Sequence, residues 1–490
     1  MRQIPAEQVL RRIRFENPWW ISPHRIPKHV QDWAPRRYLQ SFLPLVTNPE
    51  LRRAVVLMGP RRVGKTVMLH HGIADLLQQG VPPPRVAYFA VDHPLYNGLG
   101  LEDLLDLYAQ ATGTDITRDQ AFVFFDEIQY LKNWEIHLKA LFDSYPKLRP
   151  VVSGSAAAAL RLKSIESGAG RFVDFLLPPL TFVEYLELVE PGHERVRVEG
   201  WGAESPSGDW IGHWGSPDLP SLNRRFLHYL NFGGYPEVVL SPSIQEDPAR
   251  FIKEGIVDKV LLRDLPSLYG IDDIQELNYL FTTLAFNTGN EVTLKDLSSR
   301  SGTAKNTIKR YIEYLEAAFL LRVVHRLDRT GKKFKRAPSF KVYLTNPSIR
   351  SALFAPIEAD SDEMGHLVET AIFSQWFHSQ DSTSKIHFAR WKEGKGGEVD
   401  MVYRAGSGEL EWAVEAKWSD RYVDRPGSLK SAIEFCRTNG LKKVLVTTVS
   451  RRAKVEHAGI QFEFCPASEY CLTLGVNHLK AVGPPHPSSS

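Results

Sequence analysis

Short apolar runs alternate with helical patterns through the first third of the chain. Runs of strand length occur at Ala54–Met58, Val86–Val91, Phe122–Phe125 and Pro150–Ser153, and apolar residues with helical spacing occur at Arg36–Pro49 and Thr66–Gln79. This alternation is typical of a parallel sheet covered by helices. We therefore predict an α/β core over residues 36–190, preceded by an irregular arm, residues 1–35, that is rich in proline, tryptophan and arginine.

The pattern changes several times in the rest of the chain. We predict a loop or insertion at residues 191–220, a helical lid at 221–290, a compact unit at 291–346 with the form of a winged helix-turn-helix, a second α/β domain at 347–480 and a disordered tail at 481–490. The second α/β domain rests on a helix starting near Gly365 and on strand-like runs at His387–Trp391, Glu398–Tyr403, Leu410–Lys417 and Lys443–Thr447. The predicted fold class is α/β multidomain.

Composition narrows the class of protein. A chain of 490 residues, 43% hydrophobic and 24% charged, is too long for one small module and too apolar to be mainly disordered. No run approaches the ~18 apolar residues of a membrane-spanning helix, and no apolar leader follows Met1, so we expect a cytoplasmic protein with no membrane partner. The three cysteines, Cys436, Cys465 and Cys471, form no C-x-x-C pair, so neither a disulfide framework nor a structural zinc is predicted.

Charge is distributed unevenly along the chain. The formal net charge is +3, but residues 291–346 carry 13 Lys+Arg against 5 Asp+Glu, which leaves +8 in this segment and −5 in the rest. A basic segment in an otherwise acidic molecule is the electrostatic pattern of a nucleic-acid contact, with a solvated basic surface as the alternative.

A phosphate-binding motif lies directly between a predicted strand and a predicted helix. Residues 59–66 match G-x-x-x-x-G-K-[ST] in every specified position: Gly59, Pro60, Arg61, Arg62, Val63, Gly64, Lys65 and Thr66. The glycines let backbone N–H groups point at a polyphosphate, Lys65 reaches the β- and γ-phosphates, and the Thr66 hydroxyl can coordinate Mg²⁺. The predicted cofactors are therefore ATP and Mg²⁺.

The run Phe122–Phe125 ends in two carboxylates, as a Walker B strand does. We expect Asp126 to hold the magnesium shell and Glu127 to polarise the attacking water, because phosphoryl transfer needs metal and nucleophile on opposite sides of one phosphorus. Ser153 or Ser155, at the end of the next strand, is positioned to sense the γ-phosphate, unless it is an ordinary strand-end serine. Arg171 is a candidate finger for a neighbouring subunit's nucleotide, and a plain surface arginine is the alternative.

Residues 293–315 have the form of helix, glycine-containing turn and second helix, which resembles a winged helix-turn-helix. Leu294, Leu297, Ile308, Ile312 and Leu315 would form its core, and the residues expected on the exposed part of the second helix are Thr303, Lys305, Asn306, Lys309 and Arg310. A hairpin-like wing is expected to touch DNA phosphates through Arg329, Lys332, Lys333, Lys335 and Arg336. The alternative is a module that packs against protein.

The second α/β domain contains the pattern D-x(14)-E-x-K, formed by Asp400, Glu415 and Lys417. Alternation along a strand puts Glu415 and Lys417 on one face, and Glu369 in the upstream helix can supply a third carboxylate. Asp400 and Glu415 suit Mg²⁺ or Mn²⁺, and Lys417 can orient a nucleophile or stabilise developing charge. The spacing resembles the PD-(D/E)xK nuclease superfamily; a nuclease fold that binds without cutting is the alternative.

Several motifs together resemble AAA+ superfamily ATPases with the C-terminal region called DUF4143. They are Asn17–Trp20, Gly59–Thr66, Asp126–Gln129, Ser153–Ser155, Gly170–Arg171 and Gly233–Pro236. The resemblance covers nearly the whole chain except residues 191–219. It implies an AAA-type core, a helical lid with the Gly-Gly-Tyr-Pro turn, a winged helix, a restriction-endonuclease-like end domain, and a homo-oligomer in which Arg171 reaches the next subunit, a hexameric ring being the expected form.

These patterns predict an ATP-dependent DNA-processing protein that couples ATP hydrolysis to DNA binding and metal-dependent cleavage of duplex or branched DNA. Two alternatives remain at this stage. The first is a nucleotide-controlled regulator that binds DNA and does not cut, and the second is an ATPase that acts on proteins, which the basic segment at 291–346 disfavours.

Overall fold

The computed structural model describes residues 5–23, 25–48, 50, 52–154, 170–204, 210–334, 339–377, 384–392 and 396–481. Ser155, the wing residues Lys335 and Arg336, and residues 482–490 of the predicted tail lie outside these ranges. The chain forms two compact units, one ending at Pro178 and one spanning Pro179–Ala481. The boundary precedes the predicted end of the core at residue 190, so the helix Phe182–Val189 belongs to the second unit.

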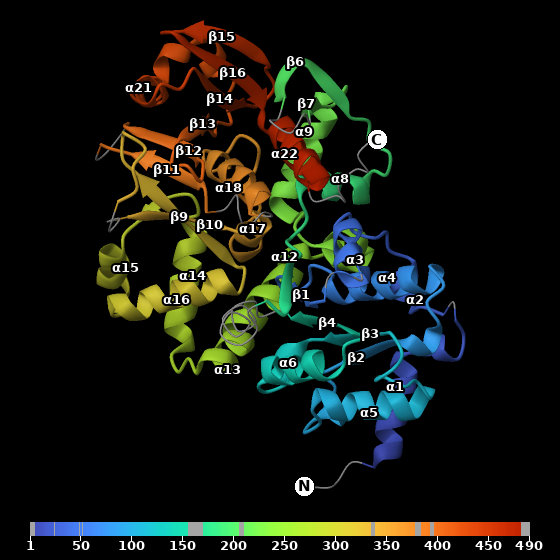
Figure 1. The fold of residues 1–490 in the computed structure, drawn as a ribbon. Coiled ribbons are helices and arrows are strands. Elements are labelled where there is room, and N and C mark those ends of the chain that lie inside the picture. Colours follow the sequence, from blue (N-terminus) through green and yellow to red (C-terminus); the bar gives the residue numbers. More distant parts are fainter. Residues whose placement is uncertain are drawn as a thin grey trace. The chain divides into compact units, whose positions relative to one another are not determined.

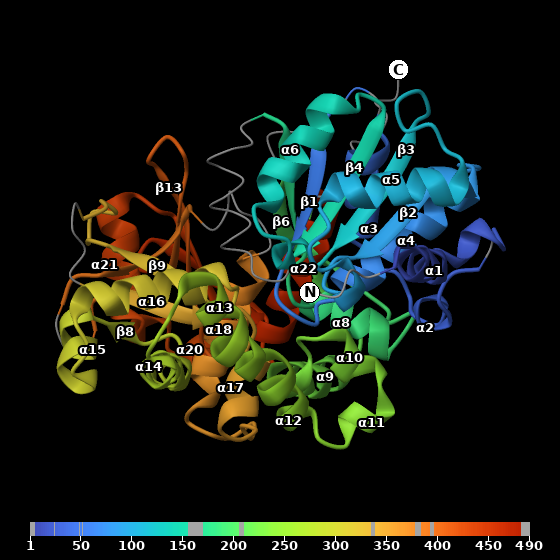
Figure 2. The same ribbon diagram turned by 90° about the horizontal axis from the view of Figure 1, so that it is seen from below.

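The first unit is built on a parallel five-stranded sheet with the strand order β2-β3-β4-β1-β5. Figure 2 shows β1, β4 and β3 side by side. Its elements are α1 (Ala6–Glu16), α2 (Lys28–Gln31), α3 (Leu39–Thr47), β1 (Ala54–Met58), α4 (Lys65–Gln78), β2 (Val86–Ala90), α5 (Leu101–Thr112), β3 (Ala121–Asp126), α6 (Trp134–Ser144), β4 (Leu148–Gly154) and β5 (Phe172–Leu176). Strands β1 and β3 are buried along their whole length, as expected for a parallel sheet covered on both faces.

The N-terminal arm is more regular than its composition suggests. Residues 1–35 were expected to be irregular, but Ala6–Glu16 forms the helix α1, because Val9 and Ile13 repeat at helical spacing and bury against the first unit. Helix α1 contacts α5 and β2. The arm is therefore part of the core of the first unit and not a loose extension.

The second unit contains one nine-stranded sheet with the order β15-β16-β14-β13-β12-β11-β9-β10-β8. Its strands are β8 (Glu291–Val292), β9 (Leu321–Leu327), β10 (Phe340–Leu344), β11 (Ile386–Arg390), β12 (Glu398–Arg404), β13 (Leu410–Glu415), β14 (Lys443–Thr448), β15 (Ala453–His457) and β16 (Ile460–Pro466). In Figure 1 they run from yellow to red. The predicted strands of the second α/β domain are all present, and β15 and β16 extend the sheet at one edge.

Helices complete the second unit. They are α8 (Phe182–Val189), α9 (Leu219–Phe232), α10 (Pro236–Leu240), α11 (Pro242–Gln245), α12 (Pro248–Ile252), α13 (Leu265–Tyr269), α14 (Ile274–Phe286), α15 (Leu294–Ser301), α16 (Lys305–Ala317), α17 (Ser348–Leu353), α18 (Met364–Trp376), α20 (Arg421–Asp424), α21 (Lys430–Asn439) and α22 (Ala467–Ala481). Helix α18 is buried on nearly every side and contacts α9, α22 and β10. It therefore lies at the centre of this unit's main core.

The predicted helical unit 291–346 and the end domain 347–480 are not separate bodies. The antiparallel hairpin of β9 and β10 is present as expected, but β11 pairs in parallel with β9 at Phe388–Arg326 and Ala389–Leu327. Strands β8, β9 and β10 and the strands of the end domain thus form a single sheet. Sequence patterns could not show this, because a parallel pairing between distant segments has no local turn signal.

The Gly233–Pro236 turn of the lid is a packing motif. A Cβ at Gly233 would lie 2.6 Å from the Tyr229 Cα, and a Cβ at Gly234 would lie 2.4 Å from the Asn346 side chain. Any side chain at either position would therefore clash with its neighbour. The Leu180 N–H donates to the Gly234 carbonyl at 2.9 Å. Glycine is needed here because α9 ends in close contact with neighbouring segments.

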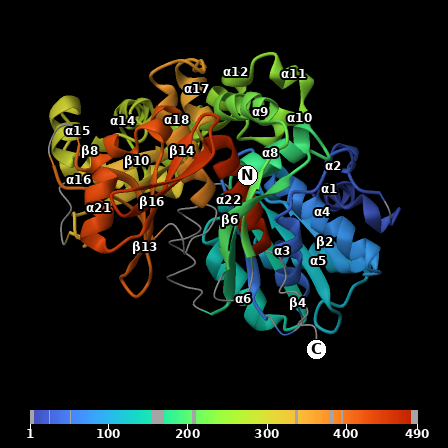
Figure 3. The same cartoon turned by 90° about the horizontal axis from the view of Figure 1, so that it is seen from above.

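Residues 191–220, expected as a loop, contain an antiparallel hairpin of β6 (Val196–Glu204) and β7 (Trp210–Gly215). Strand β7 lies against α22; Figure 1 labels both, and Figure 3 shows the hairpin from above, with β6 and α22 labelled. The Trp214 N–H donates to the Thr473 hydroxyl at 2.9 Å, and that hydroxyl donates to the Trp214 carbonyl at 3.1 Å. Long-range pairing with α22 therefore orders a segment whose own composition suggested a loop.

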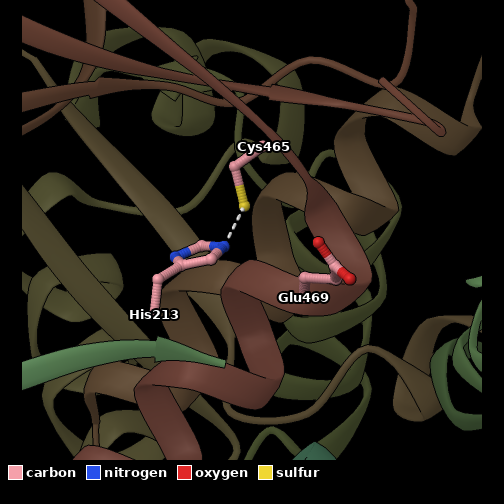
Figure 4. A group of neighbouring side chains, drawn as sticks. All are labelled: His213, Cys465 and Glu469. Atoms are coloured by element: carbon pink, nitrogen blue, oxygen red, sulfur yellow. Dashed lines mark hydrogen bonds between the residues drawn. The ribbon is translucent and has the colours of Figure 1, made fainter. Parts of the chain in front are cut away.

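A buried polar group also fastens this hairpin. His213, Cys465 and Glu469 place ligand-type atoms within 4.8 Å of one another (Figure 4), and His213 Nε2 lies 3.1 Å from Cys465 Sγ. However, Glu469 accepts two N–H groups from Arg452, one of them at 2.6 Å, and the Ser216 N–H at 3.2 Å. Because the Arg452 guanidinium already balances the Glu469 charge and engages both of its oxygens, we interpret the group as a structural network and not as a metal site.

No helix in the described ranges is both long enough and apolar enough to span a membrane.

Candidate functional site

The carboxyl ends of the parallel strands in the first unit meet at one edge of the sheet, as they must in any parallel sheet. Gly59 follows β1, Asp126 is the last residue of β3, and Ser153 is the last residue but one of β4. Since β4 lies between β1 and β3, Ser153 stands between the phosphate-binding motif and the acidic strand end. The fold thus brings three separate sequence motifs to one place.

The phosphate-binding loop has the backbone shape that its glycines predict. Gly64 has φ 92°, in the left-handed region, and immediately precedes α4. A Cβ at Gly59 would lie 2.1 Å from the Leu177 carbonyl oxygen, so only glycine fits beside the end of β5. Lys65 is buried, and its ammonium donates to the carbonyls of Gly59 at 3.0 Å and Pro60 at 2.8 Å. The loop therefore surrounds the Lys65 ammonium at the N-terminus of a 14-residue helix, which is a favourable place for a phosphate.

Asp126 is the most densely bonded side chain of this edge. Its Oδ2 accepts the hydroxyls of Thr66 at 2.6 Å and Tyr88 at 2.8 Å. Its Oδ1 accepts the Ser153 hydroxyl and the Glu127 N–H, the latter at 3.2 Å. A carboxylate offers about four lone-pair sites, so these donors hold Asp126 in one orientation. The oxygen-rich pair of Thr66 and Asp126 fits a hard cation such as Mg²⁺, with the threonine hydroxyl as ligand and the aspartate in its surrounding shell.

Glu127 takes a left-handed backbone conformation, φ 56°, directly after β3. Burial raises the pKa of Glu127, while the positive charge of Lys65 works in the opposite direction. The Gln129 amide donates to its carboxylate. A carboxyl group with a raised pKa at the end of this strand is suited to orienting a water molecule and accepting its proton.

Three predicted contributors to this site have different outcomes. Ser153 contacts Asp126 directly, whereas Ser155 lies outside the described residues. Arg171 lies at the opposite edge of the sheet from the loop, since its carbonyl accepts the N–H of Ala54, where β1 begins. Its guanidinium pairs with Asp143 at 3.0 Å. Arg171 therefore cannot serve the nucleotide loop of its own chain, and its role toward a neighbouring subunit stays a prediction.

Tyr88 was missed by sequence reasoning. It lies inside the buried strand β2, where a tyrosine looks like one more apolar residue, but its hydroxyl reaches Asp126 in the adjacent strand. The sequence held one signal of this contact, the tyrosine hydroxyl inside an otherwise apolar run. A buried tyrosine hydroxyl usually has a hydrogen-bond partner, and the acidic strand is the neighbouring one.

The second candidate site lies in the nine-stranded sheet. Lys417 Nζ lies 2.6 Å from Asp400 Oδ2 and 2.7 Å from Glu415 Oε2, so these three predicted residues converge on one point. The Ala416 N–H also donates to Asp400 Oδ2 at 2.9 Å. Asp400, Lys417 and Glu369 line one cavity of about 370 Å³. The carboxylates offer the hard oxygens that Mg²⁺ or Mn²⁺ requires.

Charge coupling separates the two carboxyl groups of this site. Burial raises the pKa of Glu415 to about 8, partly offset by Lys417. Burial acts in the same direction on Asp400, but Lys417 and Lys341 hold its pKa below the ordinary value. Desolvation disfavours the Lys417 ammonium, yet Asp400 and Glu415 raise the pKa of Lys417 well above its usual range. Two neighbouring carboxyl groups with different proton affinities are typical of a catalytic or metal-binding site.

The same cavity contains residues that the sequence patterns did not indicate. Lys341, in β10, is buried and pairs with Glu369 at 3.0 Å and with Glu398 at 2.7 Å. The Tyr343 hydroxyl donates to Glu369 at 2.6 Å. A lysine inside the apolar run Phe340–Leu344 was the signal for a buried partner. Its partners come from the end domain because β10 belongs to the shared sheet.

The predicted DNA-contacting residues are only partly as expected. Lys305, Asn306, Lys309 and Arg310 are exposed on α16, and Ile308, Ile312 and Leu315 are buried. Thr303, expected to be exposed, is buried and donates its hydroxyl to Glu276, because the turn after Gly302 folds it back onto α14. Lys332 is exposed, Arg329 pairs with Glu434 at 3.4 Å, and Lys333 bridges back to Leu327.

Comparison with known proteins agrees with the first site. Residues 51–186 match the family model of an AAA domain, and this segment holds the loop at Gly59–Thr66 and the strand that ends at Asp126. The chain contains an AAA-type ATPase domain. Residues 223–361 match a domain of unknown function, DUF8612. The chain thus has a second matched region that runs from α9 past α17 and carries a different designation from DUF4143.

Similar proteins match about two thirds of this chain. An uncharacterized protein of Haemophilus influenzae is 25% identical over 319 residues, covering 64% of this chain and 71% of that one. An uncharacterized protein of Methanocaldococcus jannaschii is 23% identical over 331 residues, covering 66% and 67%. Among solved structures, the replication initiator DnaA bound to AMPPCP and single-stranded DNA has a TM-score of 0.27 at 13% identity over 57% of this chain and 86% of that one. C. elegans PCH-2 has a TM-score of 0.26 at 10% identity over 49% and 62%. At these scores no residue role is transferred.

Proposed function

We propose that this AAA protein is an ATP-dependent DNA-processing enzyme that couples Mg²⁺-dependent ATP hydrolysis to DNA binding and to metal-dependent phosphodiester cleavage. The observation that carries the cleavage step is the convergence of Asp400, Glu415 and Lys417 on one point beside a polar cavity that Glu369 also lines. Burying several charged groups together is costly unless they interact with one another or with a ligand. Acids without a shared function are therefore not expected to be buried together around one lysine.

The residues of the cavity suggest a division of labour. A divalent cation, when bound by Asp400 and Glu415, would screen a phosphate and acidify a water molecule. Lys417, held 2.6 Å from Asp400, is placed to stabilise the charge that develops on the phosphate. Burial raises the pKa of Glu415 to about 8, so its proton must leave before its carboxylate can bind the cation, and cation binding should strengthen as the pH rises. Glu369 would supply the further carboxylate.

DNA is the proposed partner because basic residues are concentrated near this cavity's own sheet. The segment 291–346 carries 13 Lys+Arg against 5 Asp+Glu, and Lys305, Asn306, Lys309 and Arg310 are exposed on α16. An exposed helix face of this composition suits a major groove, with Lys332 and Lys333 of the proposed wing contacting phosphates.

We also propose that the protein is cytoplasmic and related to the DUF4143 type. Its proposed assembly is a homo-oligomer, a hexameric ring in which Arg171 reaches the next subunit's nucleotide.

The test is a cleavage assay with ATP and Mg²⁺ or Mn²⁺ on single-stranded, duplex and branched DNA. Asp400→Asn should abolish cleavage and leave ATP turnover near the wild-type rate, because the AAA site is formed by other residues. Glu411→Ala is the matched control, since Glu411 is an exposed carboxylate on the same strand as Glu415. Cleavage by Asp400→Asn at the wild-type rate would contradict the assignment.

A second function is favoured by one observation. The Lys341 ammonium lies between Glu369 and Glu398, and Lys417 lies between Asp400 and Glu415, so lysines can balance these acids without a metal. This arrangement suits a nucleotide-controlled DNA-binding regulator that does not cut. The same assay separates the two functions: if the wild type cleaves no substrate with either metal while Asp400→Asn binds DNA like the wild type, the regulator replaces the nuclease.

A further inference from the structure

The Asn17–Trp20 segment has no part in the ATP chemistry described above, yet it binds the edge of the ATPase sheet. Strand β2 is the last strand of the sheet order, so one side of its backbone has no neighbouring strand in the sheet. Asn17 covers part of that side: its amide donates to the Tyr88 carbonyl at 2.9 Å, and the Tyr88 N–H donates to Asn17 Oδ1 at 2.7 Å. The Asn17 side chain therefore makes the two hydrogen bonds that a paired strand would make.

The two tryptophans bind the same strand at Val86, two residues before Tyr88. The indole N–H groups of Trp19 and Trp20 both donate to the Val86 carbonyl, at 2.9 and 2.8 Å. Asn17 and Trp19 are completely buried. The Asn17 amide also donates to the Ile13 carbonyl at 2.8 Å, which ties the segment to the end of α1. The backbone of β2 at Val86 and Tyr88 is thus fixed by the N-terminal arm.

Tyr88 carries this restraint into the nucleotide site. Its ring lies against His70 of α4, with centroids 4.4 Å apart, and its hydroxyl donates to Asp126 Oδ2 at 2.8 Å. The same oxygen accepts the Thr66 hydroxyl at 2.6 Å. Tyr88 therefore touches the carboxylate that belongs to the proposed cation shell, although it reaches neither the phosphate loop nor the proposed attacking water.

We propose that Tyr88 is a positioning residue of the ATP site and that Asn17 is the residue through which the N-terminal arm sets its place. The Tyr88 hydroxyl fixes the rotation of the Asp126 carboxylate, so that Oδ2 stays turned toward Thr66. Without this donor, Asp126 has one fewer restraint and the shell around a cation on Thr66 loses its preset geometry. Hydrogen bonds of this outer kind commonly change metal affinity by about 10–100-fold when they are removed.

A purely structural role makes a different prediction. If Asn17 only caps an exposed sheet edge, its loss lowers stability and leaves the cation requirement of nucleotide binding unchanged. If it acts through Tyr88, its loss changes that requirement, and the change disappears once the Tyr88 hydroxyl is already absent. A double-mutant cycle in the full chain therefore separates the two roles.

The experiment titrates Mg²⁺ into the full chain with a fluorescent ATP analogue and records binding, so that it does not depend on turnover. We expect Tyr88→Phe to raise the half-saturating Mg²⁺ concentration about tenfold, and Asn17→Ala to raise it by a smaller factor in the same direction. The double variant should equal Tyr88→Phe alone. Tyr108→Phe is the matched control, because the Tyr108 hydroxyl donates to the Pro84 carbonyl at 2.5 Å, away from Asp126, and it should leave the titration unchanged.

Each other result has a definite meaning. A Tyr88→Phe titration equal to that of the wild type overturns the proposal while the ATPase assignment stands. Additive shifts in the double variant overturn the part played by Asn17. If Asn17→Ala does not fold, Trp20→Phe replaces it with the same expected direction, because it removes the indole donor to the Val86 carbonyl and keeps an aromatic ring beside Tyr108. A wild type that binds no nucleotide at any Mg²⁺ concentration overturns the ATP site and this proposal together.

Discussion

At the scale of single residues, the nucleotide site depends on a few side chains with complementary tasks. Lys65 lies inside the phosphate loop, and Asp126 is held in one orientation by four donors. Glu127 stands next to Asp126 but makes a different contact, with Gln129. The proposed phosphate-binding charge, the proposed carboxylate of the cation shell and the proposed carboxylate for water therefore belong to three separate residues.

We predict that Lys65→Ala abolishes nucleotide binding and that Glu127→Gln binds ATP normally but turns it over about 100-fold more slowly. The first change removes the phosphate cation, and the second removes only the group that accepts the water's proton. Steady-state phosphate release and nucleotide binding measure the two effects. Glu102→Gln, an exposed acid on α5, should behave like the wild type, and normal turnover in Glu127→Gln would sink its assignment.

At the scale of elements, long-range pairing decides what local composition leaves undefined. The hairpin of β6 and β7 is held to α22 by Thr473 and by the buried group of His213, Cys465 and Glu469. Strand β11 joins β8–β10 to the strands of the end domain through its pairing with β9. The proposed DNA contact on α16, a helix that packs against β9, and the acidic cavity beside β10 are therefore connected through one sheet.

We predict that His213 makes the protein less stable toward acid. Burial lowers the pKa of His213 to about 4, and the charges of Arg452 and Lys454 add to the effect. An unfolded histidine titrates near pH 6.5, so between pH 6.5 and 4 the unfolded chain binds a proton that the folded chain does not. The free energy of unfolding therefore falls as the pH falls through this window, and it should fall by about 2 kcal/mol between pH 7 and pH 5 on account of this group.

His213→Gln removes the titrating group and should lose that much less stability over the same interval, measured by urea denaturation at the two pH values. His457→Gln, at the exposed end of β15, is the control and should keep the wild-type pH dependence. Equal pH dependence in His213→Gln and the wild type would show that His213 does not remain neutral in the folded state.

At the scale of the whole molecule, the two units contain separate candidate sites. The first unit, which ends at Pro178, contains the nucleotide site, and the second, Pro179–Ala481, contains the acidic cavity and the exposed basic helix. Each has its own buried core. Ligands of one unit should therefore stabilise that unit first.

We predict that calorimetric unfolding shows two transitions and that a non-hydrolysable ATP analogue with Mg²⁺ raises only one of them. At a hundred times the dissociation constant, the ligand stabilises the unit that binds it by about 2.7 kcal/mol. In Lys65→Ala the analogue should move neither transition. A single transition in the wild type would mean that the two units unfold as one.

Much of the chemistry was already determined by the sequence, because it lies in short contiguous motifs. Residues 59–66 specify a phosphate loop through glycine backbone freedom and one lysine, and the acids at Asp126 and Glu127 follow directly from an apolar strand. The pattern of Asp400, Glu415 and Lys417 could be predicted to converge because side chains alternate along a strand. The strands and helices near these motifs also followed from hydrophobic period alone.

Only the tertiary structure decided which distant groups meet these motifs. Tyr88 reaches Asp126 because β2 pairs with β3, Lys341 reaches Glu369 and Glu398 because β9 pairs with β11, and Asn17 reaches β2 because the arm folds back onto an unpaired edge. Such contacts leave no periodic signal in the sequence, since a buried tyrosine or lysine in a strand looks the same whatever it faces. Strand order, which chain-wide packing selects, gives each of these side chains its partner.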